Sequence, residues 1–400
     1  MKVLIVGAGM SGLSLGHALL DAGIDVTIAS GRSSTDLRQG RAQLTQLTLA
    51  PGLAVESDLN LSLYTGTAPH FTSTSLQVIS GPGEHVGFCG AMPGESFAVD
   101  PRVKLADWYE MFEDLGGRTV THGMTVTDLE AFSTMYDIVA LAVGDGKLGQ
   151  VLDTDPSHPM GGQRVVTQAY IHHEPDEDFD RQLRVFSCPA GEVFVVPTQL
   201  QGGWAHSVML IARPGSVLDC SSGTVRRPQQ LWDLMRERLR LAHINIDPDL
   251  DRAELTDEFA VRIKSVHPTT RIPVQRLNSG RLVVGLGDTV MHVPPQNGQG
   301  CEASVRSGRS YADMIIDLAR SGRAVTDGFL SSLFPAYLDH AGGREINAFD
   351  SYVDRFWQGQ LAPHEQQLFQ RACADQSVAD DYVAGFADPA RLAAMLTAPA

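Results

Sequence analysis

Residues 2–12 read KVLIVGAGMSG, and this stretch decides the fold class. The apolar run of residues 2–6 predicts a buried strand that ends at a glycine-rich turn. Residues 11–22 have the pattern of a helix that stops before Gly23, and residues 25–29 (DVTIA) predict a second strand. The order strand, turn, helix, strand predicts the opening β-α-β unit of a dinucleotide-binding domain.

Each glycine of this turn has its own physical purpose. Gly7 permits a tight turn, Gly9 lets the backbone approach a pyrophosphate, and Gly12 allows the helix to pack close to the strand. The helix begins near Ser11, directly after Met10, and its positive end favours a bound phosphate group. We therefore predict that all five residues bind a cofactor.

A second glycine-rich signature lies far downstream. Residues 282–288 (LVVGLGD) predict a buried strand, and residues 295–300 read PQNGQG. In FAD proteins the aspartate at such a strand end can accept a hydrogen bond from the ribityl chain. The glycine turn is expected to open a helix near Ser304, where backbone N–H groups favour negative charge at the pyrimidine end of reduced flavin. The residues predicted to bind FAD in this half of the site are Gly144, Gly287, Asp288, Pro295, Gly298, Gln299 and Gly300.

The end of the second strand departs from the usual pattern. An Asp or Glu commonly holds the ribose hydroxyls at this place, but Ser30, Gly31 and Arg32 stand there instead. Arg32 is compatible with a 2′-phosphate, and hence with NADP, or with packing on an adenine ring. Both interpretations stay open from the sequence, and Ser30 and Arg32 are predicted to bind the cofactor in either case.

The composition argues against several classes of partner. A net charge of −16 opposes binding to nucleic acid and to anionic membranes. The five cysteines are scattered without a CxxC pair, which fits a reducing compartment and predicts neither a disulfide framework nor a zinc site. No apolar stretch approaches the roughly 18 residues of a membrane helix. We expect a cytoplasmic protein that binds neither nucleic acid nor a membrane.

The order of the predicted elements indicates an α/β fold. Strand-like runs between residues 163 and 213 suit an antiparallel sheet laid over a ligand cavity, and residues 31–48 predict a polar loop on the cofactor side. The tail from Asp327 onward predicts several helices. We assign a discontinuous, Rossmann-like FAD-binding domain to residues 1–60, 98–160 and 270–325, a substrate-binding β-sheet domain to 61–97 and 161–269, and a helical C-terminal region to 326–400.

Beyond its glycine motifs, the chain resembles the oxygenase component of the two-component styrene/indole monooxygenases, a branch of the FAD-dependent hydroxylases. The resemblance covers almost the whole chain and is weakest from about residue 31 to residue 97. The segments that carry it, in the family's order, are residues 98–102 (AVDPR), 115–117 (LGG), 136–139 (YDIV), 144, 148–151 (LGQV), 196–198 (VPT), 285–288 (GLGD) and 298–300 (GQG).

The resemblance implies a fold of the glutathione-reductase and hydroxybenzoate-hydroxylase type and a particular use of FAD. A separate NADH-dependent flavin reductase would supply diffusible reduced FAD, and O2 would form a C4a-hydroperoxyflavin on it. That species would epoxidise or hydroxylate a small apolar alkene or aromatic compound such as styrene or indole. The resemblance also implies that Arg102 and an arginine near Arg41 touch the flavin, that no side chain serves as a nucleophile, and that a homodimer can form.

Two departures from the family pattern keep other functions open. Glu302 stands where the family usually has Asn, and residues 43–46 (QLTQ) replace an asparagine-bearing segment, so styrene is not assumed as the substrate. The alternatives are a single-component aromatic hydroxylase that reduces its own FAD with NAD(P)H, and a non-oxygenating FAD-binding protein. The acidic run at residues 172–180 (HHEPDEDFD) lacks the ligand spacing of a known metal site and predicts a solvated loop.

Overall fold

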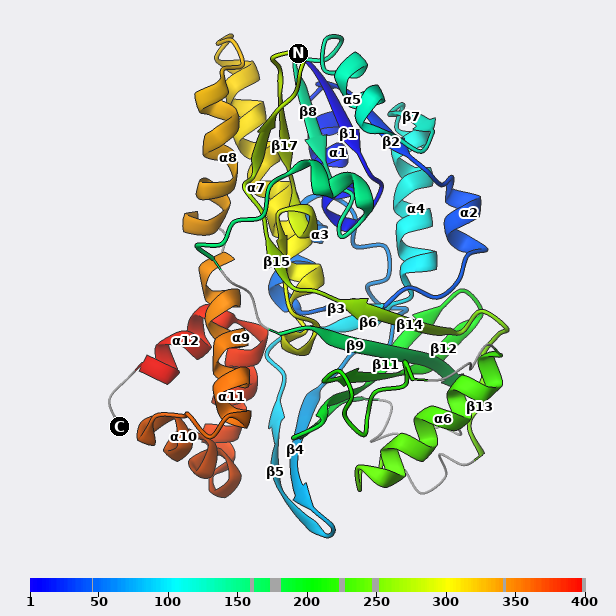
Figure 1. The fold of residues 1–400 in the computed structure, drawn as a ribbon, viewed down its shortest axis with the longest axis vertical. Coiled ribbons are helices and arrows are strands. Elements are labelled where there is room, and N and C mark those ends of the chain that lie inside the picture. Colours follow the sequence, from blue (N-terminus) through cyan, green and yellow to red (C-terminus); the bar gives the residue numbers. More distant parts are fainter. Residues whose placement is uncertain are drawn as a thin grey trace.

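The molecule is built on two sheets and a group of C-terminal helices. Figure 1 shows a first half around parallel strands, a second half around a larger sheet, and helices α9 to α12 beside the larger sheet. This computed structural model describes residues 1–44, 46–158, 162–172, 181–222, 227–246, 252–340 and 343–397. Within these ranges, every helix is too short or too polar to cross a membrane.

The first sheet contains the predicted β-α-β unit. Its strands run in the order β16-β17-β8-β1-β2-β7, and every neighbouring pair is parallel except β16 with β17. Because β1, β8 and β17 are parallel, the turns that follow them meet at one edge of the sheet. The strands are β1 (Lys2–Val6), β2 (Asp25–Ser30), β7 (Arg118–Thr121), β8 (Ile138–Leu141), β16 (Val274–Arg276) and β17 (Leu282–Gly285).

Two long helices bring the halves of the cofactor motif together. Helix α1 (Met10–Asp21) packs directly against α7 (Gly300–Arg320). The contact requires a glycine, because a Cβ on Gly308 of α7 would lie 2.8 Å from the carbonyl oxygen of Ser11 in α1. The largest apolar cluster of the molecule fills the space between the first sheet and these helices.

The larger sheet is mainly antiparallel. Its central order is β13-β9-β12-β11-β10-β4-β5, with β14 attached to β9 and with β6 attached to β11 and to β3. Only the pairs β10 with β4 and β11 with β6 are parallel. The strands are β3 (Gln46–Thr48), β4 (Ser73–Gly81), β5 (Glu84–Ala91), β6 (Phe97–Val99), β9 (Arg164–His172), β10 (Gln182–Cys188), β11 (Gly191–Leu200), β12 (Gly203–Ala212), β13 (Glu254–Leu255) and β14 (Val261–Val266).

The remaining elements surround the two sheets. A small ladder joins β15 (Thr269–Thr270) to β18 (Met291–His292). Short 3₁₀ turns in the described ranges include η1 (Lys147–Val151), η3 (Gly287–Thr289) and η4 (Pro295–Asn297). The other helices are α2 (Ser34–Arg38), α3 (Ala50–Asp58), α4 (Pro101–Asp114), α5 (Val126–Phe132), α6 (Pro228–Leu241), α8 (Asp327–His340), α9 (Gly343–Trp357), α10 (Pro363–Ala374), α11 (Gln376–Ala387) and α12 (Pro389–Thr397).

The α/β prediction is confirmed, with two local differences. The segment predicted as a loop over residues 31–48 contains α2 and β3. A capping box starts α2 at Ser33, and Arg38 holds the helix on α4 through ion pairs of 2.8 Å to Asp107 and 2.7 Å to Glu110. Helix α7 begins at Gly300 and not near Ser304, because the chain enters the helix directly after the glycine turn.

Candidate functional site

The two glycine-rich turns meet at one cavity of about 800 Å³ between the sheets. Its walls come from both turns, from the segment after β2 and from one face of the larger sheet. Gly12, Arg102, Gly287 and Gln299 are not part of the wall. The predicted residues on the wall are Gly7, Gly9, Met10, Ser11, Ser30, Arg32, Arg41, Gly144, Asp288, Pro295, Gly298 and Gly300.

The first turn presents backbone to the cavity. Gly7 has φ +117°, and a Cβ there would lie 2.1 Å from the carbonyl oxygen of Ala142, so the position requires glycine. At Gly9, by contrast, a Cβ would meet no atom within 4 Å, which leaves space beside the backbone. Helix α1 begins at Met10 with no side-chain cap and no acidic residue in its first turn. The N–H groups at its start are therefore available to an anion.

The second turn supplies a carboxylate and a second helix start. Asp288 in η3 is partly buried, and its Oδ1 has no hydrogen-bond partner. Burial raises the pKa of Asp288, and the charges of His292 and Lys264 oppose that shift. Gly298 has φ +67° and α7 follows at Gly300 without a side-chain cap. An acceptor oxygen and a set of backbone donors thus face the same cavity.

Two hydrogen bonds join the end of β8 and its following turn to the turn after β17. The backbone N–H of Gly144, after β8, donates to Thr289 Oγ1 in η3 at 2.9 Å. The N–H of Leu286 donates to the carbonyl oxygen of Leu141 at 2.9 Å. These bonds hold the edge of the first sheet where the turns after β8 and β17 meet.

Positive side chains that the motifs did not predict also line the cavity. Arg262 and Lys264 of β14 stand on the wall with Arg32, and Lys264 Nζ pairs with Asp145 at 2.8 Å. Burial lowers the pKa of Arg32, and the charge of Arg262 lowers it further. The sequence does contain a signal for these two residues. Apolar and polar side chains alternate over residues 261–266 (VRIKSV), which places Arg262 and Lys264 on one face of a strand.

Opposite the glycine turns, the larger sheet presents an apolar wall. Val166 of β9, Phe194 and Val196 of β11, and Met209 and Ile211 of β12 line the cavity. Phe194 and Met209 are directly paired across the strands. The position of the substrate between this face and the cofactor stays a prediction.

Comparison with known proteins decides the class of enzyme. Residues 1–49 match the "FAD binding domain" family, and residues 144–244 match the family described as "Styrene monooxygenase A putative substrate binding domain". Styrene monooxygenase StyA of Pseudomonas fluorescens is 26% identical over 306 residues, 75% of this chain and 73% of the relative. StyA of Pseudomonas sp is 26% identical over 322 residues, 79% and 76% of the two chains. The chain is a styrene-monooxygenase-like flavoprotein. The resemblance predicted from the motifs is confirmed, and FAD is the cofactor.

Solved structures of flavoenzymes share the fold of this styrene-monooxygenase-like flavoprotein. The p-nitrophenol 4-monooxygenase PnpA of Pseudomonas putida DLL-E4 aligns with a TM-score of 0.65 and 14% identity, over 97% of this chain and 98% of that chain. The flavin-dependent brominase Bmp2 aligns with a TM-score of 0.64 and 14% identity, over 96% and 93%. At such identities the likeness shows the fold alone.

The cavity of the flavoprotein fits FAD on three structural grounds. The open space at Gly9 leaves room for a pyrophosphate against the backbone. The uncapped start of α1 offers N–H donors to its negative charge. The unpartnered Oδ1 of Asp288 offers an acceptor to a ribityl hydroxyl. Which wall residues bind FAD stays a prediction.

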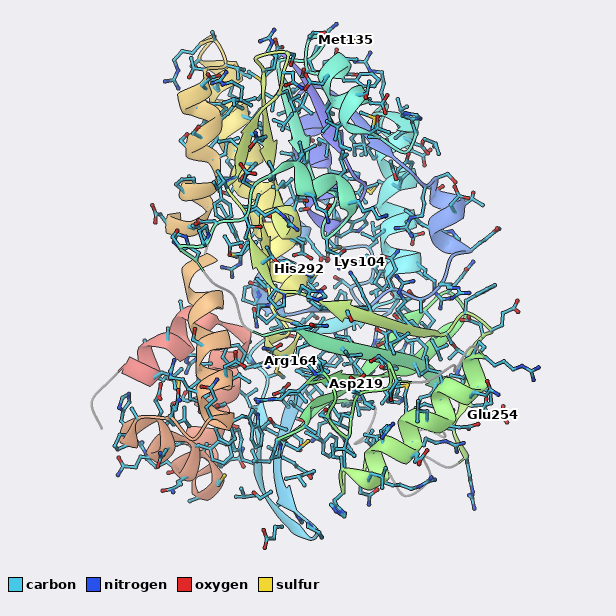
Figure 2. The ribbon with its side chains drawn as sticks, viewed as in Figure 1. Lys104, Met135, Arg164, Asp219, Glu254 and His292 are labelled. Carbon is cyan, nitrogen blue, oxygen red and sulfur yellow. The ribbon has the colours of Figure 1, made fainter. Side chains whose placement is uncertain are left out.

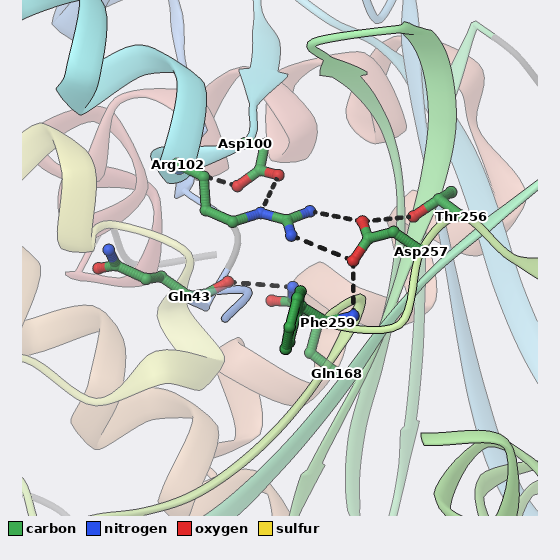
Figure 3. Close-up of polar contacts among 7 residues, drawn as sticks. All are labelled: Gln43, Asp100, Arg102, Gln168, Thr256, Asp257 and Phe259. Atoms are coloured by element: carbon green, nitrogen blue, oxygen red, sulfur yellow. Dashed lines mark hydrogen bonds and ion pairs between the residues drawn. The ribbon is translucent and has the colours of Figure 1, made fainter. Parts of the chain in front are cut away.

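Arg102 lies beside the cavity and is held by two carboxylates. Its Nε donates to Asp100 Oδ2 at 2.7 Å, and its Nη2 pairs with Asp257 Oδ2 at 3.0 Å. Figure 3 shows that Asp257 also accepts from the backbone N–H of Phe259. Arg102 therefore links the start of α4 to the loop before β14, and the flavin contact implied by the resemblance stays a prediction.

The segment that departs from the family after β2 also reaches the cavity. Gln43 and Leu44 line the wall, and the carbonyl oxygen of Gln43 accepts from Gln168 Nε2 of β9 at 3.0 Å (Figure 3). Residue 45 lies outside the described ranges. The segment in which this chain differs from the family therefore lies on the cavity wall, where a change of side chain can alter which molecules the cavity binds.

The three other predicted residues absent from the wall support it from behind. A Cβ on Gly12 would lie 2.1 Å from a carbonyl oxygen of the same turn, and one on Gly287 would lie 2.6 Å from Ser11 Oγ. Gln299 is fully buried, and its Nε2 donates to the carbonyl oxygen of Phe386 in α11 at 2.9 Å. These residues set the shape of the turns and tie the site to the C-terminal helices.

A buried ion pair, not predicted from the sequence, backs the wall at Cys301. Lys104 is 1% exposed, and its Nζ donates to Glu56 Oε1 at 2.5 Å and to Thr48 Oγ1 at 3.1 Å. Figure 2 labels Lys104 where the two halves of the molecule meet. Thr48 Oγ1 lies 3.2 Å from Cys301 Sγ. Burial raises the pKa of the Cys301 thiol to about 12, so this thiol is neutral and not a nucleophile.

Glu302, which stands where the family usually has Asn, points away from the cavity. Cys301 and Ser304 line the wall, but Glu302 does not. Its carboxylate pairs with Arg306 Nη2 at 2.5 Å within α7 and lies so close to α3 that a Cβ on Gly52 would be 2.9 Å from it. Burial raises the pKa of Glu302 to about 7, and the charge of Arg306 opposes that shift. The substitution therefore adds no carboxylate to the flavin wall.

The structure gives no indication of a metal centre in the ranges it describes. No three His, Cys, Asp or Glu side chains gather there in a way that could hold an ion. Of the acidic loop predicted at residues 172–180, His172 is the last residue of β9, and residues 173–180 lie outside those ranges.

Proposed function

We propose that this flavoprotein is the oxygenase component of a two-component monooxygenase. It takes up diffusible reduced FAD from a separate NADH-dependent flavin reductase and transfers one oxygen atom of O2 to a small aromatic or apolar substrate such as styrene or indole. One observation carries the proposal: a single cavity has both FAD motifs on one side and an apolar sheet face on the other. The curated relatives, both styrene monooxygenases, support the same reaction class.

The residues of the chain bind, orient and exclude water, while the flavin supplies the redox chemistry. Bound in its reduced form, FAD supplies the electrons with which O2 gives one atom to the substrate and the other to water. The start of α1, with Arg32 and Arg262 nearby, would hold the pyrophosphate, and Asp288 would accept from a ribityl hydroxyl. The start of α7 would stabilise negative charge on the reduced flavin. Phe194 and Val196 would keep water from the substrate end.

We also propose that the sequence segments divide this work as predicted. Residues 1–60, 98–160 and 270–325 would bind FAD, residues 61–97 and 161–269 would bind the substrate, and residues 326–400 would form a C-terminal helical region. The match of residues 144–244 to a substrate-binding family supports the second assignment. Strand β3 belongs to the first segment but pairs with β6 in the larger sheet, so the FAD-binding part also contributes to the substrate side.

The test is a reaction in which neither NAD(P)H nor a reductase is present. The purified protein is mixed with chemically reduced FAD and with styrene, indole, indene or thioanisole, and ¹⁸O2 is then admitted. We expect one ¹⁸O atom in the product, and no product when the protein is omitted or when oxidised FAD replaces reduced FAD. The proposal would be contradicted if reduced FAD passed all its electrons to O2 as hydrogen peroxide and none of the four compounds gave a labelled product. The protein would then be a non-oxygenating FAD-binding protein.

Arg32 favours one alternative, a single-component hydroxylase that reduces its own FAD. Arg32 and Arg262 stand on the same wall, and two guanidinium groups suit the 2′-phosphate of NADPH. The protein is therefore mixed with FAD, NADPH and substrate in the absence of a reductase. We expect no oxidation of NADPH. Oxidation that depends on substrate, and a KM for NADPH that rises in Arg32→Ala, would establish the single-component enzyme instead.

A further inference from the structure

A second cavity adjoins the flavin cavity and is lined almost entirely by apolar side chains. It lies between strands β4, β5, β10 and β11 and the helices α9, α10 and α11, which Figure 1 shows beside the β4–β5 hairpin. Its volume is about 80 Å³, several times the space that a single water molecule needs. Phe194 lines both cavities, so they share a wall. Aromatic rings dominate the lining, among them Phe88, Phe194, Phe349, Tyr352, Trp357 and Phe386.

A carboxyl group lies in this aromatic wall. Glu192 of β11 is 3% exposed and stands two residues before Phe194, on the same face of the strand. Neither oxygen of its carboxyl group has a hydrogen-bond partner. In the same wall, Trp357 Nε1 donates to Ser187 Oγ at 3.0 Å and so directs its hydrogen to that hydroxyl. Glu192 therefore offers two acceptor atoms in an apolar cavity.

Glu192 is not part of a structural ion pair. Burial raises its pKa to about 7, and the charges of Arg164 and Arg213 and the nearby indole N–H of Trp357 oppose that shift. None of these groups meets the geometry of a hydrogen bond to the carboxyl oxygens. Arg164 Nη2 pairs instead with Asp354 of α9 at 2.9 Å, and Figure 2 labels Arg164 where the larger sheet meets the C-terminal helices. A buried carboxyl group without a partner destabilises the fold. Its position in a cavity wall indicates that a ligand supplies the partner.

We propose that Glu192 selects the substrate: the aromatic cavity holds an aromatic molecule that carries an N–H or O–H group, and Glu192 accepts the hydrogen bond of that group. The inference rests on the proposed oxygenase function and narrows its substrates from small apolar or aromatic compounds to aromatic compounds with a donor. The aromatic walls pack against the ring, and a carboxyl group keeps an acceptor oxygen in either protonation state. A hydrocarbon leaves that acceptor unpaired, and sites built to bond a donor discriminate strongly against the analogue without it.

Indole and indene provide a matched pair of probes. The two bicyclic compounds are nearly alike in shape, and only indole carries an N–H donor. Equilibrium dialysis with saturating FAD measures both dissociation constants without oxygen transfer. We expect the native protein to bind indole at least about tenfold more tightly than indene. In Glu192→Met, which keeps the bulk and removes the acceptor, the ratio falls to about one; in Glu192→Gln, which keeps a carbonyl acceptor, much of the preference remains.

Glu302→Gln is the matched control, because it alters an equally buried carboxyl group that lines neither cavity. Its indole-to-indene ratio should equal that of the native protein. Equal binding of indole and indene by the native protein would overturn the inference, as would an indole preference that survives in Glu192→Met. Thermal unfolding checks that each variant folds. If Glu192→Met does not fold, the indole-to-indene ratios of the native protein and of Glu192→Gln test the inference. A preference for indole over indene without any ¹⁸O-labelled product would contradict only the proposed oxygenase function. Labelled product from styrene with equal binding of indole and indene would contradict only the role of Glu192.

Discussion

The flavin cavity and the aromatic cavity share a wall but are made from different parts of the chain. The flavin cavity depends on backbone: glycines that admit close contact, and two helices that start without side-chain caps. The aromatic cavity depends on side chains from two sheet hairpins and three C-terminal helices. The comparison shows why a cofactor site leaves a local signature in a sequence while a substrate site does not. Backbone geometry is encoded by neighbouring residues, but a lining of side chains is assembled from distant ones.

The two cavities also treat buried charge differently. Behind the flavin cavity, Lys104 and Glu56 neutralise each other at 2.5 Å. In the aromatic cavity, Glu192 stays without a bonded partner. A paired charge stabilises the wall that it supports, whereas an unpaired one is available to a ligand.

The largest effect is expected at the backbone of the first turn. Gly12→Val places a side chain 2.1 Å from a carbonyl oxygen that cannot move without opening the turn, so we expect a loss of about 3 kcal/mol or more and little folded protein. Gly9→Ala is the control, because its Cβ meets no atom within 4 Å. This variant should unfold at the native temperature but bind reduced FAD more weakly. Thermal unfolding measures the stability of each variant, and dialysis against reduced FAD measures its affinity for the cofactor. A Gly12→Val protein as stable as the native one would refute the packing role of Gly12.

Removal of one partner of the buried ion pair should have the next largest effect. Lys104→Met leaves Glu56 buried and uncompensated, which should lower the free energy of unfolding by about 3–5 kcal/mol. The double variant Lys104→Met with Glu56→Gln should recover most of that loss, because no charge then remains unpaired. Urea unfolding measures the three proteins. Equal stability of the single and the double variant would show that the pair does not stabilise the flavin wall.

The unpaired carboxyl group of the aromatic cavity should make stability depend on pH. Burial raises the pKa of Glu192 from 4.5 to about 7, so between these values the folded protein keeps a proton that the unfolded chain has lost. Its contribution to stability therefore falls as pH rises through that window, by roughly 3 kcal/mol in all. Glu192→Gln removes this term, so the variant should gain stability relative to the native protein between pH 5 and pH 7.5 in urea unfolding. A constant difference between the two proteins at both pH values would contradict the raised pKa.

The smallest of these effects is expected at one carboxylate of the flavin wall. Asp288→Ala removes the proposed acceptor for a ribityl hydroxyl, so the Kd for reduced FAD should rise about tenfold or more. The free energy of unfolding should change little or increase, because a carboxyl group with a raised pKa is removed. Glu302→Gln should leave the Kd for FAD unchanged, since that side chain points away from the cavity. Anaerobic dialysis measures the Kd for reduced FAD in each variant. An unchanged Kd in Asp288→Ala would show that Asp288 does not bind the ribityl chain.

The sequence predicted those parts of the site that depend on short-range order. Gly7, Gly9 and Gly298 lie on the predicted wall because a turn is specified by the few residues within it. Arg262 was missed because β14 is short and its cations reach the cavity only through pairing with β9. Helix α2 was missed because ion pairs from Arg38 to α4, far away in the sequence, hold it in place. In each case the missing information was a contact between distant segments.

The sequence by itself determined the fold class, the FAD motifs and the resemblance to styrene monooxygenases, because glycine spacing and strand patterns are local properties of the chain. Only the tertiary structure decided which way Glu302 points, that Arg102 is held between Asp100 and Asp257, and that the carboxyl oxygens of Glu192 have no hydrogen-bond partner in their aromatic wall. These outcomes depend on what packs around a side chain. Burial and part of the nearest charge come from distant segments, as Asp257 does for Arg102, and no local pattern records them.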